Sequence, residues 1–140
     1  MKLFTIGYGG AAPRAFTACL VKAGIRTVVD VRLRPDRASM GTYVKAKTPD
    51  KGIERLLGEA GIGYRSLPEL GNVFLDYDDW RERYAALLAR AGDLLVSRLA
   101  GVAGPICLLC AERRPEECHR MLIAQYLASA AGKEIEHLMP

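Results

Sequence analysis

One segment of the chain concentrates the side chains that most often carry out chemistry. Residues 110–120 read Cys-Ala-Glu-Arg-Arg-Pro-Glu-Glu-Cys-His-Arg and hold two thiols, an imidazole, three carboxylates and three guanidinium groups. The segment follows an apolar run at 105–109 that is typical of a buried strand, and it precedes a helical pattern at 121–131. A loop that only turned the chain would more often contain Gly, Asn and Ser. We therefore expect this loop to carry function.

Cys110 and Cys118 are the candidate nucleophiles of this segment. We expect Cys110 at the end of a strand and Cys118 two or three residues inside a helix that begins near Pro115, where the helix N-terminus favours a thiolate. His119 could act as base or acid near neutral pH, and Glu112 is a further acid–base candidate. The alternative for either cysteine is a small buried side chain beside a turn.

The spacing of the same residues disfavours a metal site and a redox pair. A zinc site would use Cys110, Cys118 and His119, but the loop holds no Cys-x-x-Cys pair, and adjacent residues on a helix point about 100° apart. A redox pair of Cys110 and Cys118 would require the loop to fold back on itself. We therefore predict no metal and no cofactor, and favour an anion-binding site beside a nucleophilic or acid–base residue.

Strand and helix patterns alternate along the chain. Apolar and β-branched runs predict five strands, and helical spacing predicts four helices between them. The strands are expected at 2–6, 26–31, 62–67, 105–110 and 133–138, and the helices at 13–23, 49–60, 78–99 and 115–131. This alternation predicts a single three-layer α/β domain over residues 1–140, with a mostly parallel sheet of about five strands and helices on both faces. The strand order does not follow from the sequence.

The loops that follow parallel strands share one edge of the sheet, and ligands of such folds usually bind there. The loop at 110–120 should therefore meet the loops after the first two strands. Asp30 and Arg32 are two residues apart and can point to the same side of an extended chain, although a plain structural ion pair is the alternative. The residues predicted to bind an anion are Gly7, Tyr8, Asp30, Arg32, Arg113 and Arg120.

Composition limits the location and the partners of the protein. The 140 residues include 20 Lys and Arg against 16 Asp and Glu, a net charge of +4 that permits an anionic partner without requiring one. The sequence predicts no secretory signal and no membrane-spanning segment, so we expect a cytoplasmic protein with four reduced cysteines. Cys19 and Cys107 fall in apolar patterns and are expected in the core.

Short motifs are spread over nearly the whole chain. They are Thr5-Ile6-Gly7-Tyr8, Val29-Asp30-Val31-Arg32 with Pro35, Gly61-Ile62-Gly63-Tyr64, Leu70-Gly71, Leu109-Cys110-Ala111-Glu112 with Pro115, Cys118-His119-Arg120, and Ile135-Glu136-His137-Leu138. The set resembles the family called domain of unknown function 488, and the Cys-Ala-Glu and Cys-His-Arg elements are its most specific part. The resemblance implies a small single-domain α/β protein of bacterial or archaeal type, and it implies no particular reaction.

Two hypotheses for the function follow from these observations. In the first, the protein is an enzyme acting on a phosphorylated or nucleic-acid-related substrate, with Arg32, Arg113 and Arg120 holding the anion. Either cysteine would then be the nucleophile, or Glu112 and His119 would act as acid and base. In the second, the protein is a nucleic-acid or nucleotide binding module without chemistry, and further basic side chains contact phosphates. These are Arg34, Arg37, Lys45 and Lys47.

Both hypotheses make the partner a small anionic or phosphorylated ligand, or a nucleic acid, and neither involves a membrane. The sequence makes no prediction of the oligomeric state. The geometric expectation is sharper, because one small ligand site requires its side chains to share one cavity. The side chains expected to line it are Asp30, Arg32, Cys110, Glu112, His119 and Arg120.

Overall fold

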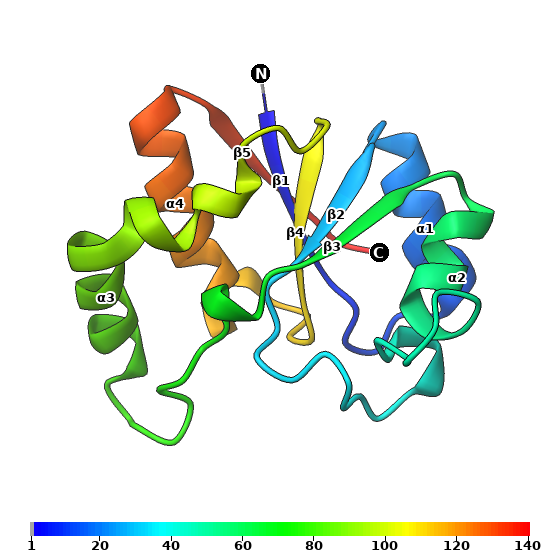
Figure 1. The fold of residues 1–140 in the computed structure, drawn as a ribbon, viewed down its shortest axis with the longest axis horizontal. Helices are drawn as coiled ribbons and strands as arrows, with labels where there is room; N and C mark the ends of the chain where they lie inside the picture. Colours follow the sequence, from blue (N-terminus) through cyan, green and yellow to red (C-terminus); the bar gives the residue numbers. More distant parts are fainter. Residues whose placement is uncertain (1) are drawn as a thin grey trace.

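Five short strands form one sheet in which every neighbouring pair is parallel (Figure 1). The structure is a computed structural model that describes residues 2–140. The strands are β1 (Lys2–Gly7), β2 (Thr27–Asp30), β3 (Gly63–Ser66), β4 (Ile106–Cys110) and β5 (Glu134–Leu138), and their order in the sheet is β3-β2-β4-β1-β5. The predicted α/β fold is confirmed, with a sheet that is entirely parallel.

Helices cover both faces of the sheet, as predicted, with α1 and α2 on one face and α3 and α4 on the other (Figure 1). Short 3₁₀ turns lie in the connections. The helices are α1 (Pro13–Lys22), α2 (Gly52–Glu59), α3 (Trp80–Leu95) and α4 (Arg120–Ala131), and the 3₁₀ turns are η1 (Gly41–Tyr43), η2 (Pro68–Leu70), η3 (Ser97–Leu99) and η4 (Pro115–Glu117). Within residues 2–140, no helix combines the length and the apolar character that crossing a membrane requires.

The central strands are apolar on both sides because each face of the sheet packs against helices. Successive residues alternate between two cores. On β4, Cys107 and Leu109 join the core under α1 and α2, whereas Leu108 and Cys110 join the core under α3 and α4. Cys107 is fully buried, and Cys19 packs at the edge of the first core, as expected for core residues.

The predicted start of the second helix and the predicted end of the third helix are wrong. The second helix begins at Gly52 instead of Pro49, because residues 48–50 form an exposed turn in which the Thr48 hydroxyl bonds the Asp50 carboxylate. Gly52, the first residue of the helix, has φ +64°, and this conformation separates the exposed turn from the helical residues that follow. The third helix ends at Leu95, and a 3₁₀ turn accounts for the rest of the predicted span.

The topology determines where a crevice can open. The chain runs from β1 and β2 into helices on one face, and from β3 and β4 into helices on the other. Since β2 and β4 are neighbours in the sheet, the loops that follow them separate toward opposite faces. Such a switch point at the carboxyl edge is where open α/β sheets bind their ligands.

Candidate functional site

A cavity of about 210 Å³ opens at the carboxyl edge of the sheet, between the loops that follow β1, β2, β3 and β4. Six of the ten predicted site residues line it. They are Tyr8, Arg32, Cys110, Glu112, Cys118 and His119. The other four are absent from its lining and take the positions described below. They are Gly7, Asp30, Arg113 and Arg120.

Asp30 lies beneath the cavity and holds Arg32 in place. The Arg32 Nε donates to Asp30 Oδ1 at 2.9 Å and its Nη2 donates to Oδ2 at 2.7 Å, with both residues buried. The hydroxyl of Tyr64 donates to the same carboxylate. Burial would lower the pKa of Arg32, but the hydrogen bonds and charge of Asp30 outweigh that effect and raise it. Arg32 therefore stays a fixed cation on the cavity wall.

Tyr8 is fixed by its neighbours on two sides. Its ring stacks on Tyr43 with centroids 4.4 Å apart, and the Tyr43 hydroxyl donates to the carbonyl of Ala11 at 2.8 Å. Arg32 Nη1 donates to the Tyr8 hydroxyl at 3.3 Å. The guanidinium carbon of Arg32 also lies over the Tyr8 ring, 5.3 Å from its centroid, so the ring is a fixed, 6 % exposed part of the cavity wall.

Arg120 is fully buried and faces the loop after β4. Its Nη1 donates to Cys110 Sγ at 2.9 Å and to the Glu112 carbonyl at 2.6 Å, and its Nη2 donates to the Arg113 carbonyl at 3.2 Å. Burial lowers the pKa of Arg120 to about 10. No carboxylate within residues 2–140 forms an ion pair with it. The guanidinium holds the loop and the sulfur of Cys110, and the exposed Arg113 contributes a backbone carbonyl to this arrangement.

The same guanidinium connects the site to a second histidine. Arg120 Nε donates to Thr5 Oγ1 at 3.2 Å, and Thr5 Oγ1 lies 2.6 Å from His137 Nδ1. Thr5 Oγ1 therefore accepts from Arg120 and shares a second hydrogen bond with His137 Nδ1, whose direction is set by the histidine tautomer. Burial, assisted by the charge of Arg120, lowers the pKa of His137. No local sequence signal points to Thr5, because this contact joins residues 115 positions apart.

Gly7 is needed for the close approach of two backbone segments. A Cβ atom at this position would overlap the carbonyl group of Glu112 and lie 3.0 Å from Arg120 Nη1. At Gly9, a Cβ atom would lie 2.9 Å from the Ala111 carbonyl oxygen. The glycine-rich segment after β1 therefore lets the loop after β4 lie directly on it.

Cys110 and Cys118 are joined by a disulfide, whereas Cys19 and Cys107 are free. The expectation that all four cysteines are reduced is therefore wrong for this pair. The prediction that Cys118 lies inside the fourth helix is also wrong, because α4 begins at Arg120. The 3₁₀ turn η4 folds the loop back and Cys118 follows it in an extended conformation, with φ −129° and ψ 143°. This fold-back brings its sulfur to Cys110.

His119 presents a free ring nitrogen to Cys118. Its Nε2 lies 2.9 Å from the carbonyl of Val31, which can only accept, so Nε2 carries the proton. The unprotonated Nδ1 lies 3.6 Å from Cys118 Sγ, and the backbone N–H of Arg120 donates to the same sulfur at 3.4 Å. Burial lowers the pKa of His119 to about 4, and the charge of Arg120 adds to this. The imidazole is therefore neutral at pH 7 and can accept a hydrogen bond from a thiol at this position.

Asn72 and Arg37 also line the cavity, although the sequence did not point to Asn72. Asn72 is 3 % exposed, and its Oδ1 accepts the N–H of Phe74 at 2.9 Å. Its amide nitrogen bonds no acceptor within the described part of the chain. Asn72 follows β3 at the same sheet edge, so the topology could have suggested it. Across residues 2–140, no three His, Cys, Asp or Glu side chains are grouped to hold a metal ion.

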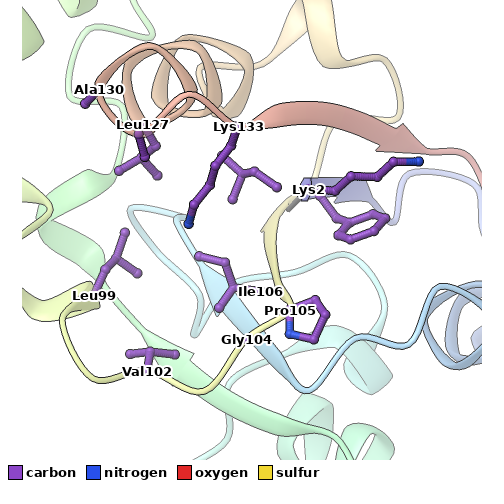
Figure 2. A pocket seen from close by; sticks show the side chains of 12 residues that line it. Lys2, Leu99, Val102, Gly104, Pro105, Ile106, Leu127, Ala130 and Lys133 are labelled. Carbon is purple, nitrogen blue, oxygen red and sulfur yellow. The ribbon is translucent and has the colours of Figure 1, made fainter.

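A second, larger cavity of about 800 Å³ lies at the opposite edge of the sheet (Figure 2). Its walls are largely apolar and include Leu99, Ile106 and Leu127. The amine of Lys133 points into it, whereas Lys2 points away and pairs with Glu136 at 3.0 Å (Figure 2). Nucleophilic sulfur and imidazole groups line only the smaller of these two cavities.

Comparison with known proteins gives one match. A family model described as Domain of unknown function DUF488 matches residues 12–127 of the 140-residue chain. The match includes the Asp30–Arg32 pair and the whole Cys110 to Arg120 loop, and the motifs at Thr5–Tyr8 and Ile135–Leu138 lie outside it. No curated protein and no solved structure matches the chain.

Proposed function

This chain belongs to the family of domain of unknown function DUF488, and we propose that it binds a small anionic, phosphorylated molecule in the cavity at the carboxyl edge and acts on it through a thiol. One observation carries the proposal. Guanidinium and amide donors occupy the side of the cavity formed by the loops after β2 and β3, and two sulfurs and an imidazole occupy the side formed by the loop after β4. A ligand held by the first side presents a reacting atom to the second.

The donor side offers three different groups to an anion. Arg32 uses three of its five N–H hydrogens on Asp30 and Tyr8, which leaves two for a ligand. Arg37 is exposed and forms no ion pair within the described residues, and Asn72 adds a neutral amide donor. Planar guanidinium groups suit the paired oxygens of a phosphate.

Two carboxylates orient the ligand. Glu112 and Glu117 line the cavity on the side of the sulfurs. Their charge repels an anion, so the phosphate of a ligand is directed to the arginine side and an uncharged part is directed to the sulfurs. The proposal therefore concerns a molecule with one anionic end and one electrophilic or otherwise reactive end.

The reduced form of Cys110 is the proposed nucleophile. Arg120 donates a charged hydrogen bond to this sulfur, and a nearby cation favours the reactive thiolate. The neighbouring His119 presents an unprotonated Nδ1 to the second sulfur, which provides the site with a hydrogen-bond acceptor for the Cys118 thiol. Ligand binding and thiol reactivity can thus be measured separately.

Protection against alkylation tests both parts. The protein is reduced and treated with iodoacetamide, with and without a nucleoside monophosphate as probe, and labelled peptides are measured by mass spectrometry. We expect Cys110 to react faster than Cys19 and to be protected by the probe. Arg37→Gln should weaken this protection about tenfold, the value of one charge-assisted hydrogen bond. Arg26→Gln, at the opposite end of β2, is the matched control. Absence of protection at millimolar probe would refute the binding proposal.

A nucleic-acid binding role receives less support from the same contacts. Arg34 pairs with Asp36 at 3.0 Å and Lys45 pairs with Glu54 at 3.5 Å, so two of the four additional basic residues are already engaged. A cavity of about 210 Å³ accommodates a small molecule. We therefore base the proposal on a small ligand.

A further inference from the structure

The disulfide between Cys110 and Cys118 lies in the wall of the cavity, at the point where the proposed chemistry takes place. Both residues are nearly inaccessible, at 3 % and 4 % exposure. We propose that Cys110 and Cys118 form a redox-active pair that reduces small hydroperoxides, with Cys110 as the attacking sulfur and Cys118 as the resolving one. This activity uses none of the donors on the arginine side of the cavity.

The surroundings of Cys110 make it the attacking sulfur. Arg120 lies beside it as a buried cation, with Nη1 at 2.9 Å from Sγ and no carboxylate ion pair among the described residues. A buried cation is strongly stabilised by a negative charge nearby. When the disulfide is reduced, the Cys110 thiolate supplies that charge, and a thiolate is the form that attacks an electrophile.

The surroundings of Cys118 suit the second step. Its sulfur accepts the backbone N–H of Arg120 at 3.4 Å, and it lies 3.6 Å from the unprotonated Nδ1 of His119. The extended backbone of Cys118 after the η4 turn brings this sulfur to Cys110. His119 Nδ1 and the Arg120 N–H therefore orient the Cys118 thiol for attack on the oxidised Cys110.

The size of the cavity selects the oxidant. A protein disulfide cannot reach sulfurs that are 3 % and 4 % exposed within a cavity of about 210 Å³. Glu112 and Glu117 flank the sulfurs and disfavour an anionic oxidant. A small neutral hydroperoxide meets both restrictions.

The proposed cycle balances in three steps. The Cys110 thiolate attacks a peroxide oxygen, the S–O bond forms as the O–O bond breaks, and the departing alkoxide or hydroxide takes a proton from water. Cys118 sulfur then attacks Cys110 sulfur, the S–S bond forms as the S–O bond breaks, and the Cys118 proton leaves with the hydroxyl as water. A small-molecule dithiol finally exchanges with the disulfide, becomes oxidised itself and restores two thiols.

Stoichiometric peroxide consumption by the reduced protein tests the proposal. Hydrogen peroxide is the probe, and peptide mass spectrometry follows the sulfurs. We expect one equivalent to be consumed as the Cys110–Cys118 disulfide forms, at least about tenfold faster than the thiols of Cys19 and Cys107 oxidise. In Cys118→Ser, a dimedone adduct should appear on Cys110. In Cys110→Ser, the fast phase should be lost, whereas Cys19→Ser is the matched control and should keep it.

Three results would overturn the proposal. They are a fast phase that survives Cys110→Ser, dimedone labelling on a residue other than Cys110, and a rate equal to that of a free cysteine. Arg120→Lys keeps the charge but loses the fork of donors, so it should slow the fast phase, and a circular dichroism spectrum checks that the variant folds. Because no phosphorylated ligand is present, these results are independent of the anion-binding proposal. Failure of ligand protection leaves the peroxide measurement fully interpretable.

Discussion

Protonation of His119 at low pH should destabilise this protein. Its contribution to the free energy of unfolding can be measured with a single substitution. The pKa of His119 falls from its ordinary value of 6.5 to about 4 in the folded protein, chiefly because the ring is buried. The unfolded chain therefore takes up this proton at a higher pH than the folded chain does. The stability contributed by the neutral ring is present above about pH 6.5 and is lost as the pH falls toward 4.

The magnitude follows from the two pKa values. Each pH unit between them changes the free energy of unfolding by about 1.4 kcal/mol. The whole interval corresponds to about 3 kcal/mol, and the part between pH 7 and pH 5 corresponds to about 2 kcal/mol. A loss of this size is a large share of the stability of an ordinary domain.

Urea unfolding at pH 7 and pH 5 measures the effect. His119→Gln replaces the titrating ring by an amide that can still donate to the Val31 carbonyl. Between pH 7 and pH 5, the free energy of unfolding should fall by about 2 kcal/mol more in the wild-type protein than in the variant. His137 and the carboxylates are present in both proteins, so their contributions cancel. Equal losses in the two proteins would refute the assignment of a neutral, buried His119.

Two further substitutions test the architecture of the site. Gly7→Ala should reduce the free energy of unfolding by about 2 kcal/mol or more, because the added methyl group overlaps the backbone of the loop after β4; Gly58→Ala, with open space in α2, should be neutral or stabilising. Asp30→Asn should cost about 3 kcal/mol, because it leaves the buried Arg32 without its counter-charge; Asp36→Asn, in an exposed pair, should change the unfolding midpoint little.

Much of the fold was predictable because its signals are local. Apolar runs separated by helical patterns define the strands, and parallel strands place their following loops at one edge. The pairing of Asp30 with Arg32 could likewise be predicted from a two-residue spacing in an extended segment. The strand order could not, because it depends on how whole βα units pack and no single residue encodes it.

The arrangement of the thiols was less predictable because it depends on where one helix begins. The sequence favours a start near Pro115, which would keep Cys118 in the first turn of the helix. The chain instead makes a 3₁₀ turn and starts α4 at Arg120. That shift of one turn makes a disulfide possible where the spacing argued against one. The contacts of Arg120 could not be predicted from the sequence either. One partner, Thr5, is distant in the sequence, and the others include loop carbonyls, which no residue type identifies.

The interactions of Arg120 divide the cavity into two walls that differ in how readily they tolerate substitution. Its contacts bind α4, β1 and the loop after β4 into one unit that fixes both sulfurs. The segment 33–42, which follows β2, contributes nothing to that unit and reaches the cavity only from the other side. If the proposed function holds, substitutions in that segment alter which ligand is recognised and leave the sulfur chemistry unchanged. Under the proposed function, relatives that share the Arg120 network and differ in this segment would use the same sulfur chemistry on different ligands.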